Sequence, residues 1–242
     1  SPWWIHPHER PHAPATSCDV LVEQQFMEQL VDLLEVNSEK NVLIAGHHPA
    51  ISNGNYGGRN AIGQHFSPPV IGTFKAAYHQ NIGDPKDMAY SAYRSFAGSL
   101  KFLLQDQSPF IYASAHDYNL QILEFENSYQ LVSGAIVKKV AAATSRNTIY
   151  RSKDQGFIKL TYYHDGKVMA DVVELAEGKI LGITSKELYQ SSCNPDMSGA
   201  PLNSRYVPCR KKSFPAEHMN PDFADSIGAA VGGAEYKAGL MK

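Results

Sequence analysis

Two short apolar runs, each followed at once by a histidine-containing loop, constrain the fold most. The first run is Asn41–Ala45, which leads into Gly46-His47-His48-Pro49. The second is Phe110–Ser114, which leads into Ala115-His116-Asp117. Apolar runs of this length with β-branched residues are typical of buried strands. Because ligand sites in open α/β sheets form where such strands end, the sequence predicts one site that contains both histidine loops.

Amphipathic segments accompany these runs. In Val20–Val36, apolar residues recur at the spacing of one helix face, which predicts a helix that ends at Asn37. Asp87 is a suitable N-cap residue, so a second helix is expected to follow it and to reach Leu104. The segment 49–86 contains glycine and proline clusters and is expected to form a long loop. A loop of that length in a compact domain is more often functional than idle.

The later part of the chain has the pattern of antiparallel strands. Strands are expected over residues 120–126, 129–133, 157–163 and 168–175. Asp165-Gly166 separates the last two strands and is a strong hairpin signal. Elements in this order predict an α/β fold with a late antiparallel hairpin. After Leu175 the composition changes to Ser, Asn, Pro, Ala and Gly, so we divide the chain into a domain over 1–175 and an extension or linker over 176–242.

The composition excludes several classes of protein. Hydrophobic residues make up 43% of the 242 residues, which indicates a packed core. The formal net charge is -2, so no nucleic acid is expected as a partner. No apolar run approaches the roughly 18 residues that span a bilayer. The 3 cysteines are too few for a fold that is built on disulfides. The function must therefore be sought in the loops of a globular domain.

The two histidine loops carry a resemblance to a known family. Gly46-His47-His48-Pro49 is followed by the glycine-rich loop 53–58, and the second loop reads Ser114-Ala-His-Asp-Tyr-Asn-Leu-Gln121. Together they resemble the C-terminal part of a calcineurin-like metallophosphoesterase domain. The purple-acid-phosphatase-like branch is the most similar, because its last motif reads Gly-His-Asp-His-Asn-Leu-Gln. The resemblance covers about residues 1–175.

The resemblance implies a four-layer α/β/β/α sandwich with a centre of two divalent metal ions at the strand ends. His47 and His116 match two ligands of one ion. Tyr118 stands where the family has a histidine ligand of the other ion, and we interpret it as an altered ligand position. The expected ions are zinc, manganese or iron. Two ions held in this way bind phosphate and activate water for phosphoester hydrolysis.

Polar side chains near the first histidine loop are candidates for binding a phosphoester substrate. Arg59 is the strongest candidate, because a guanidinium matches phosphate oxygens with two hydrogen bonds. The other candidates are His48, Asn55 and His65, for each of which a role in shaping the loop is the alternative. No residue is assigned as a catalytic acid or base. A separate group, His6, His8 and His12, lies among prolines and is interpreted as irregular loop.

Motifs that would complete the family's metal centre are not found in this sequence. The family's Asp-x-His, Gly-Asp-x-x-Asp and Gly-Asn-His motifs supply the bridging carboxylate, an asparagine ligand and a proton donor. We expect them upstream of Ser1, in the other half of the same domain. The prediction is therefore a metal-dependent phosphoester hydrolase in the full-length protein, with the chain 1–242 inactive by itself. The alternative is a non-catalytic structural or docking module of a cell-envelope assembly.

The end of the chain carries a second, shorter resemblance. Gly232-Gly-Ala-Glu-Tyr-Lys-Ala-Gly239 resembles the junction between bacterial envelope phosphoesterases and an outer-membrane surface-antigen β-barrel. It implies a secreted protein of the cell envelope, periplasmic or surface-exposed, with a barrel or an envelope complex as partner. An envelope location in turn favours a disulfide between Cys193 and Cys209 over two free thiols.

Overall fold

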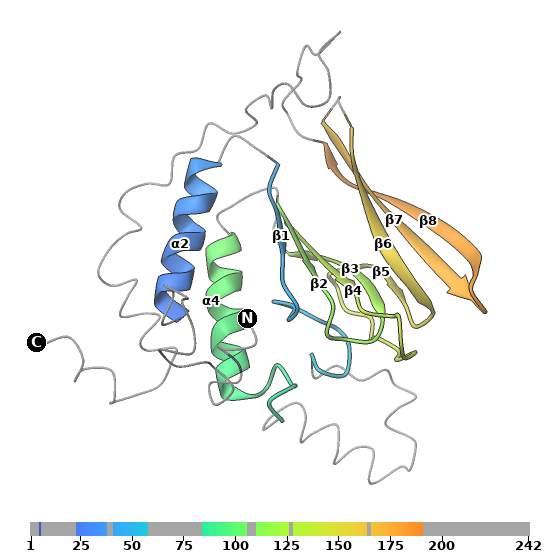
Figure 1. Ribbon diagram of the computed structural model, residues 1–242, viewed down its shortest axis with the longest axis horizontal. Helices are drawn as coiled ribbons and strands as arrows, with labels where there is room; N and C mark the ends of the chain where they lie inside the picture. Colours follow the sequence, from blue (N-terminus) through green and yellow to red (C-terminus); the bar gives the residue numbers. More distant parts are fainter. Residues whose placement is uncertain are drawn as a thin grey trace, which may run out of the picture. The chain divides into compact units, whose positions relative to one another are not determined.

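The structure, a computed structural model, describes residues 5, 23–37, 41–57, 84–105, 110–125, 128–163 and 166–190. Figure 1 shows the elements within these ranges. In chain order they are α2 (Glu23–Val36), β1 (Leu43–Ala45), α4 (Ser91–Gln105), β2 (Ile111–Ser114), β3 (Leu120–Phe125), β4 (Ser128–Ser133), β5 (Thr148–Ser152), β6 (Gln155–Tyr162), β7 (Lys167–Ala176) and β8 (Lys179–Gln190).

The first sheet has five strands in the order β1-β2-β4-β3-β5. β1 and β4 both run parallel to β2, whereas β3 runs antiparallel to β4 and β5. Ala45 pairs with Ala113, so the carboxyl ends of β1 and β2 lie side by side. The two histidine loops begin at these ends, and the parallel pairing therefore brings them to the same edge of the sheet.

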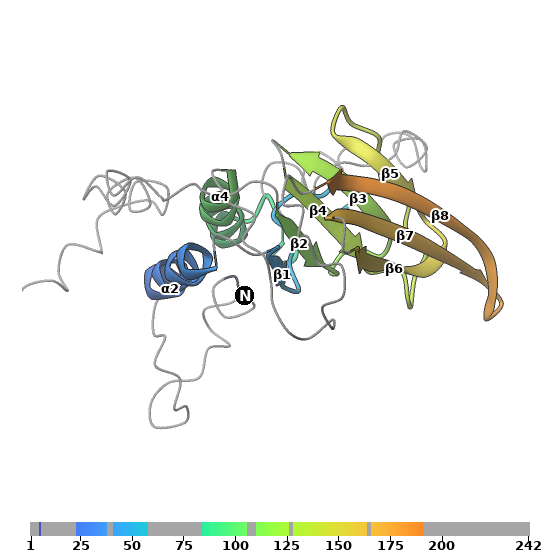
Figure 2. The same cartoon turned by 90° about the horizontal axis from the view of Figure 1, so that it is seen from above.

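One face of this sheet is covered by α2 and α4 (Figures 1 and 2). The alternation of side chains along β2 explains the division between the two faces. Phe110 and Tyr112 belong to the core under the helices, while Ile111 between them belongs to the core on the opposite face. Both cores are formed by residues with almost no exposed surface, so the sheet is buried on both sides.

The opposite face packs against a second, antiparallel sheet of the order β6-β7-β8. Alternate residues of β7, Val168, Ala170 and Val172, are fully buried against the first sheet. β7 and β8 are joined by Glu177 (φ 52°) and Gly178 (φ 77°), the two positive φ values that a tight hairpin turn requires. The described residues thus form a helix layer and two sheet layers.

The α/β class and the late antiparallel hairpin are confirmed, since β6 and β7 pair along their whole length. The first predicted helix is described from Glu23 to Val36, and residues 20–22 of the prediction lie outside the described residues. The second begins at Ser91, so the prediction that Asp87 caps it is wrong. Asp87 instead lies in a preceding turn, where its carboxylate accepts the backbone N–H of Asp84 at 2.7 Å.

Three strands differ from the expectation. β1 was expected to be buried, but it lies at the edge of the five-stranded sheet and Leu43 is 47% exposed. An apolar run shows that a strand is present, but it does not show whether the strand is central. β5 was not predicted. β8 lies within the segment 176–242 that the composition assigned to an extension, because the Pro- and Ser-rich remainder outweighed its short apolar run. The division into domains itself stays a prediction.

Candidate metal centre

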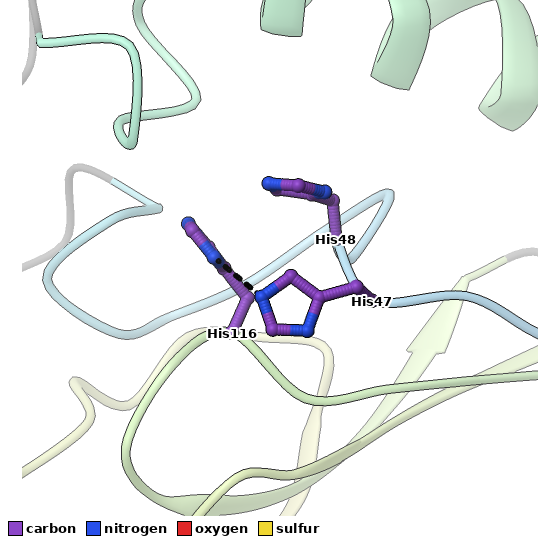
Figure 3. A group of neighbouring side chains, drawn as sticks. All are labelled: His47, His48 and His116. Carbon is purple, nitrogen blue, oxygen red and sulfur yellow. Dashed lines mark hydrogen bonds between the residues drawn. The ribbon is translucent and has the colours of Figure 1, made fainter. Parts of the chain in front are cut away.

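Three histidine side chains converge at the ends of β1 and β2 (Figure 3). His116 Nδ1 lies 3.3 Å from His47 Nε2. The ring centroid of His48 lies 4.9 Å from that of His47 and 4.5 Å from that of His116. One ligand atom from each ring lies within 4.8 Å of the other two. The predicted convergence of His47 and His116 is confirmed, and the structure adds His48, for which the sequence predicts a role in substrate binding.

His116 has a constrained backbone. Its φ of 61° lies in the left-handed region, which costs a residue with a Cβ atom about 1–2 kcal/mol. The N–H of Asp117 bonds back to the carbonyl of Ala115 at 2.7 Å, so the chain turns sharply at His116. The N–H of Ala115 donates to the carbonyl of His47 at 3.1 Å. Such an unfavourable conformation is held by its surroundings and is often found at functional sites.

The imidazole of His116 is oriented by a distant backbone group. Its Nε2 atom lies 2.7 Å from the carbonyl oxygen of Lys86. A carbonyl only accepts, so Nε2 carries the hydrogen, and in the neutral ring Nδ1 keeps its lone pair. Nδ1 is the atom that faces His47. The bond therefore directs the Nδ1 lone pair toward His47 and the centre of the histidine group.

Asp117 ties the second histidine loop to the turn that follows the first. Its side chain is 1% exposed and accepts hydrogen bonds from the Ser52 hydroxyl and from the backbone N–H of Tyr56, the latter at 3.2 Å. Burial raises the pKa of Asp117 to about 6, and the two hydrogen bonds limit the rise. Gly54 is needed here, because a Cβ atom at this position would lie 2.5 Å from the Asp117 carboxyl carbon.

Two amide side chains of the first sheet hold residues 50–53 in place. Gln130 of β4, which is 0% exposed, accepts the N–H of Ala50 at 2.9 Å and donates to the carbonyl of Tyr112 at 3.0 Å. Gln121 of β3 accepts the N–H of Asn53 at 2.9 Å and donates to the Ser52 hydroxyl at 3.0 Å. These bonds fix the loop after His48 to strands that are distant in sequence.

Tyrosine hydroxyls fix the backbone at the start of the same loop. Tyr112 donates to the carbonyl of His48 at 2.8 Å, and Tyr93 of α4 donates to the carbonyl of Pro49 at 3.0 Å. Burial raises the pKa of both phenols, so they remain donors. A Cβ atom on Gly46 would lie 2.3 Å from the Tyr112 oxygen, so glycine allows this close approach. Sequence analysis missed these supporting residues.

Of the other residues predicted at the site, Tyr118 and Asn55 are described by the structure and the rest are not. The Tyr118 ring lies 6.2 Å from that of Tyr56, and Lys138 Nζ lies 4.9 Å from the Tyr118 ring centroid. Asn55 has a buried side-chain oxygen without a hydrogen-bond partner among the described residues. The roles predicted for these residues, and for His48 in substrate binding, stay predictions. Arg59, His65 and the two cysteines Cys193 and Cys209 lie outside the described residues.

The histidine group fits a divalent transition metal. Neutral imidazole nitrogens are common ligands of zinc, iron, copper and nickel. The exposed His47 opens the group to solvent, whereas His48 is 3% exposed. The Lys86 carbonyl resembles the outer hydrogen-bond partner of a metal-binding histidine, because it fixes which ring nitrogen carries the hydrogen.

Comparisons with known proteins give distant structural similarities. No protein-family model and no curated protein matches the sequence. The structure is similar to that of GAP50, the anchor in the inner membrane complex of Plasmodium, with 15% identity and a TM-score of 0.48. It is also similar to the purple acid phosphatase PPD1 from yellow lupin (Lupinus luteus) seeds, with 11% identity and a TM-score of 0.36.

The chain spans only part of these proteins. The match to GAP50 covers 95% of this chain and 53% of that one, and the match to the lupin phosphatase covers 72% and 29%. Among the described residues, no helix is both long enough and apolar enough to cross a membrane.

Proposed function

We propose that this chain forms part of a metal-dependent phosphoester hydrolase of the calcineurin-like type. The observation that carries the proposal is the 3.3 Å approach of His116 Nδ1 to His47 Nε2, at the ends of two adjacent parallel strands. These are the two residues that the resemblance assigns as ligands of one ion. A divalent ion held there would polarise a phosphoryl oxygen and lower the pKa of a water molecule.

The described residues would orient the ligands rather than transfer protons. The Lys86 carbonyl holds the hydrogen on Nε2 of His116, so Nδ1 carries the lone pair that faces His47. The buried Asp117 holds the second histidine loop against the Ser52–Tyr56 turn. Rigid support of this kind keeps ligands in place when substrate binds. In the proposal, Arg59 and His65 bind the phosphate oxygens, and Tyr118 occupies the altered ligand position.

The proposal extends to the assembly and location of the protein. A second metal position would need carboxylate and asparagine ligands from the upstream half of the domain, so turnover is assigned to the full-length protein. The envelope location, the barrel or envelope-complex partner and the Cys193–Cys209 disulfide stay predictions.

The test compares hydrolysis of p-nitrophenyl phosphate by the full-length protein in the presence of zinc, manganese or iron. His47→Ala and His116→Ala are expected to lower kcat/KM by at least ~100-fold, because each removes a ligand. Lys153→Ala, in an exposed turn before β6, is the control and should leave the rate unchanged. Equal turnover in the histidine variants and the wild type would refute the proposed metal centre, and no turnover by the wild type would refute the hydrolase. Metal binding without turnover would favour the non-catalytic alternative.

A further inference from the structure

We infer that His48 is a third metal ligand, and that His47, His48 and His116 hold a single ion of the zinc class without residues from outside this chain. The inference shares the metal centre of the proposed function and goes further in three respects. It assigns a ligand role to His48, it fixes at one the number of ions that this chain holds by itself, and it selects among the candidate metals.

The distance between the first two nitrogens already suits such an ion. Zinc–nitrogen bonds are about 2.0–2.1 Å long, and two ligands on a tetrahedral ion are then roughly 3.3–3.4 Å apart. His116 Nδ1 and His47 Nε2 lie 3.3 Å apart. Since the hydrogen of His116 is on Nε2, where the Lys86 carbonyl accepts it, Nδ1 carries a lone pair, and this lone pair faces His47 at that distance.

His48 is placed to complete the set. Its ring contacts those of His116, at 4.5 Å between centroids, and Tyr93, at 5.2 Å, and its side chain is buried. Its backbone carbonyl is fixed by the Tyr112 hydroxyl, so only the side chain needs to move. The largest separation among the three ligand atoms is within 4.8 Å. A rotation about the side-chain bonds that moves one nitrogen by about 1.5 Å would bring it to the ligand spacing.

The donor set selects the metal. Three imidazoles and no carboxylate favour zinc, cobalt, nickel or copper over magnesium and manganese, which prefer oxygen ligands. Three protein ligands leave the fourth position of a tetrahedral ion open. The exposure of His47 places that open position toward solvent. The group therefore has the composition of a reactive single-ion site rather than of a closed structural one.

The experiment titrates the metal-free chain with Zn²⁺, Co²⁺, Mg²⁺ and Mn²⁺ by calorimetry and follows Co²⁺ by visible absorption. We expect one Zn²⁺ or Co²⁺ per chain, a tetrahedral cobalt spectrum, and no measurable heat with Mg²⁺ or Mn²⁺. His48→Ala and His48→Gln should each lower the Zn²⁺ affinity by at least ~10-fold, as should His47→Ala and His116→Ala. Near-ultraviolet circular dichroism of each metal-free variant separates loss of a ligand from loss of the fold.

A matched variant excludes the other histidine group. Replacement of His6, His8 and His12 together by alanine should leave the stoichiometry and the affinity unchanged. Affinity that is lost in His47→Ala but retained in both His48 variants would overturn the inference and leave the proposed two-histidine site standing. Absence of one-to-one binding in the wild-type chain would overturn it as well. Turnover by the full-length protein is measured separately, so failure of the hydrolase is distinguishable from failure of this inference.

Discussion

The backbone carbonyl of Lys86 accepts the Nε2 hydrogen of His116 at 2.7 Å, across 30 residues of sequence. The Lys86 segment is itself held against the first histidine loop, because the N–H of Met88 donates to the carbonyl of Tyr56 at 2.7 Å. Main-chain geometry thus selects one of the two neutral forms of the imidazole, the one with hydrogen on Nε2.

We expect the metal-free protein to show His116 as the Nε2–H tautomer. The reason is that a carbonyl at 2.7 Å stabilises only the form with hydrogen on that nitrogen. Long-range ¹H–¹⁵N spectra of the imidazoles report the tautomer directly, and His116→Gln identifies the signal. A neutral His116 with hydrogen on Nδ1 would show that the Lys86 contact does not exist in solution.

Gln130→Met is expected to destabilise the protein by about 3 kcal/mol. It retains the side-chain length but leaves the buried N–H of Ala50 without its Gln130 acceptor, at about 1–3 kcal/mol, and removes the hydrogen bond to the carbonyl of Tyr112, at about 1 kcal/mol. Urea unfolding measures the change. Gln155→Met is the matched control, since Gln155 makes one exposed bond to the carbonyl of Ile136 and its loss should cost less than about 0.5 kcal/mol. Equal effects in the two variants would contradict the supporting role of Gln130.

Gly134→Ala and Gly98→Ala should act in opposite directions. A Cβ atom on Gly134 would lie 1.8 Å from the backbone oxygen of Asp117, so the second histidine loop must shift, and we expect a loss of about 3 kcal/mol. A Cβ atom on Gly98, in helix α4, meets nothing within 4 Å, and alanine should stabilise the helix by about 1 kcal/mol. Thermal unfolding of both variants gives the comparison. Stabilisation by Gly134→Ala would mean that this loop lies elsewhere.

Glu23→Gln is expected to stabilise the protein at neutral pH. Burial raises the pKa of Glu23 above its ordinary value of 4.5, an effect that the hydrogen bond with Ser99 opposes. A raised pKa means that the folded state binds the proton more tightly, so this contribution to stability is complete below pH 4.5 and is lost as the pH rises through the raised pKa. The difference in urea midpoint between variant and wild type should therefore grow from pH 4 to pH 7. A difference that does not change with pH would contradict the shift.

The elements that carry the histidines could be predicted because their signals are local. An apolar run that stops at a glycine or alanine followed by histidine specifies both a strand and what lies at its end. That His47 and His116 meet follows once the two strands are parallel neighbours. The inclusion of His48 did not follow, because adjacent residues on a regular strand point to opposite faces and only the irregular loop after Ala45 allows both rings to converge.

The supporting contacts were harder to foresee. Lys86 contributes a backbone oxygen, and any residue type could do so, so the sequence gives no signal for it. Gln130 does give a signal, because a glutamine within the apolar strand Tyr129–Val132 is a polar group that needs hydrogen-bond partners when buried. The same holds for Gln121 in the Asn-Leu-Gln motif, whose amide holds Asn53. Polar residues within buried strands were therefore the available signal for the side chains that support the loop after His48.

Because Gln130 accepts the N–H of Ala50, the residues after the first histidine loop should be more stable than the strand that precedes it. Regular strands are usually the more stable of the two. β1 is a three-residue edge strand with an exposed Leu43, whereas Ala50, beyond the histidines, is anchored to β4. In hydrogen-exchange terms, the amides of the regular strand should open before the amide of the irregular loop that it leads into. Opening of β1 would then leave the histidine group undisturbed, because the loop is hydrogen-bonded to Gln130 in the interior of the sheet.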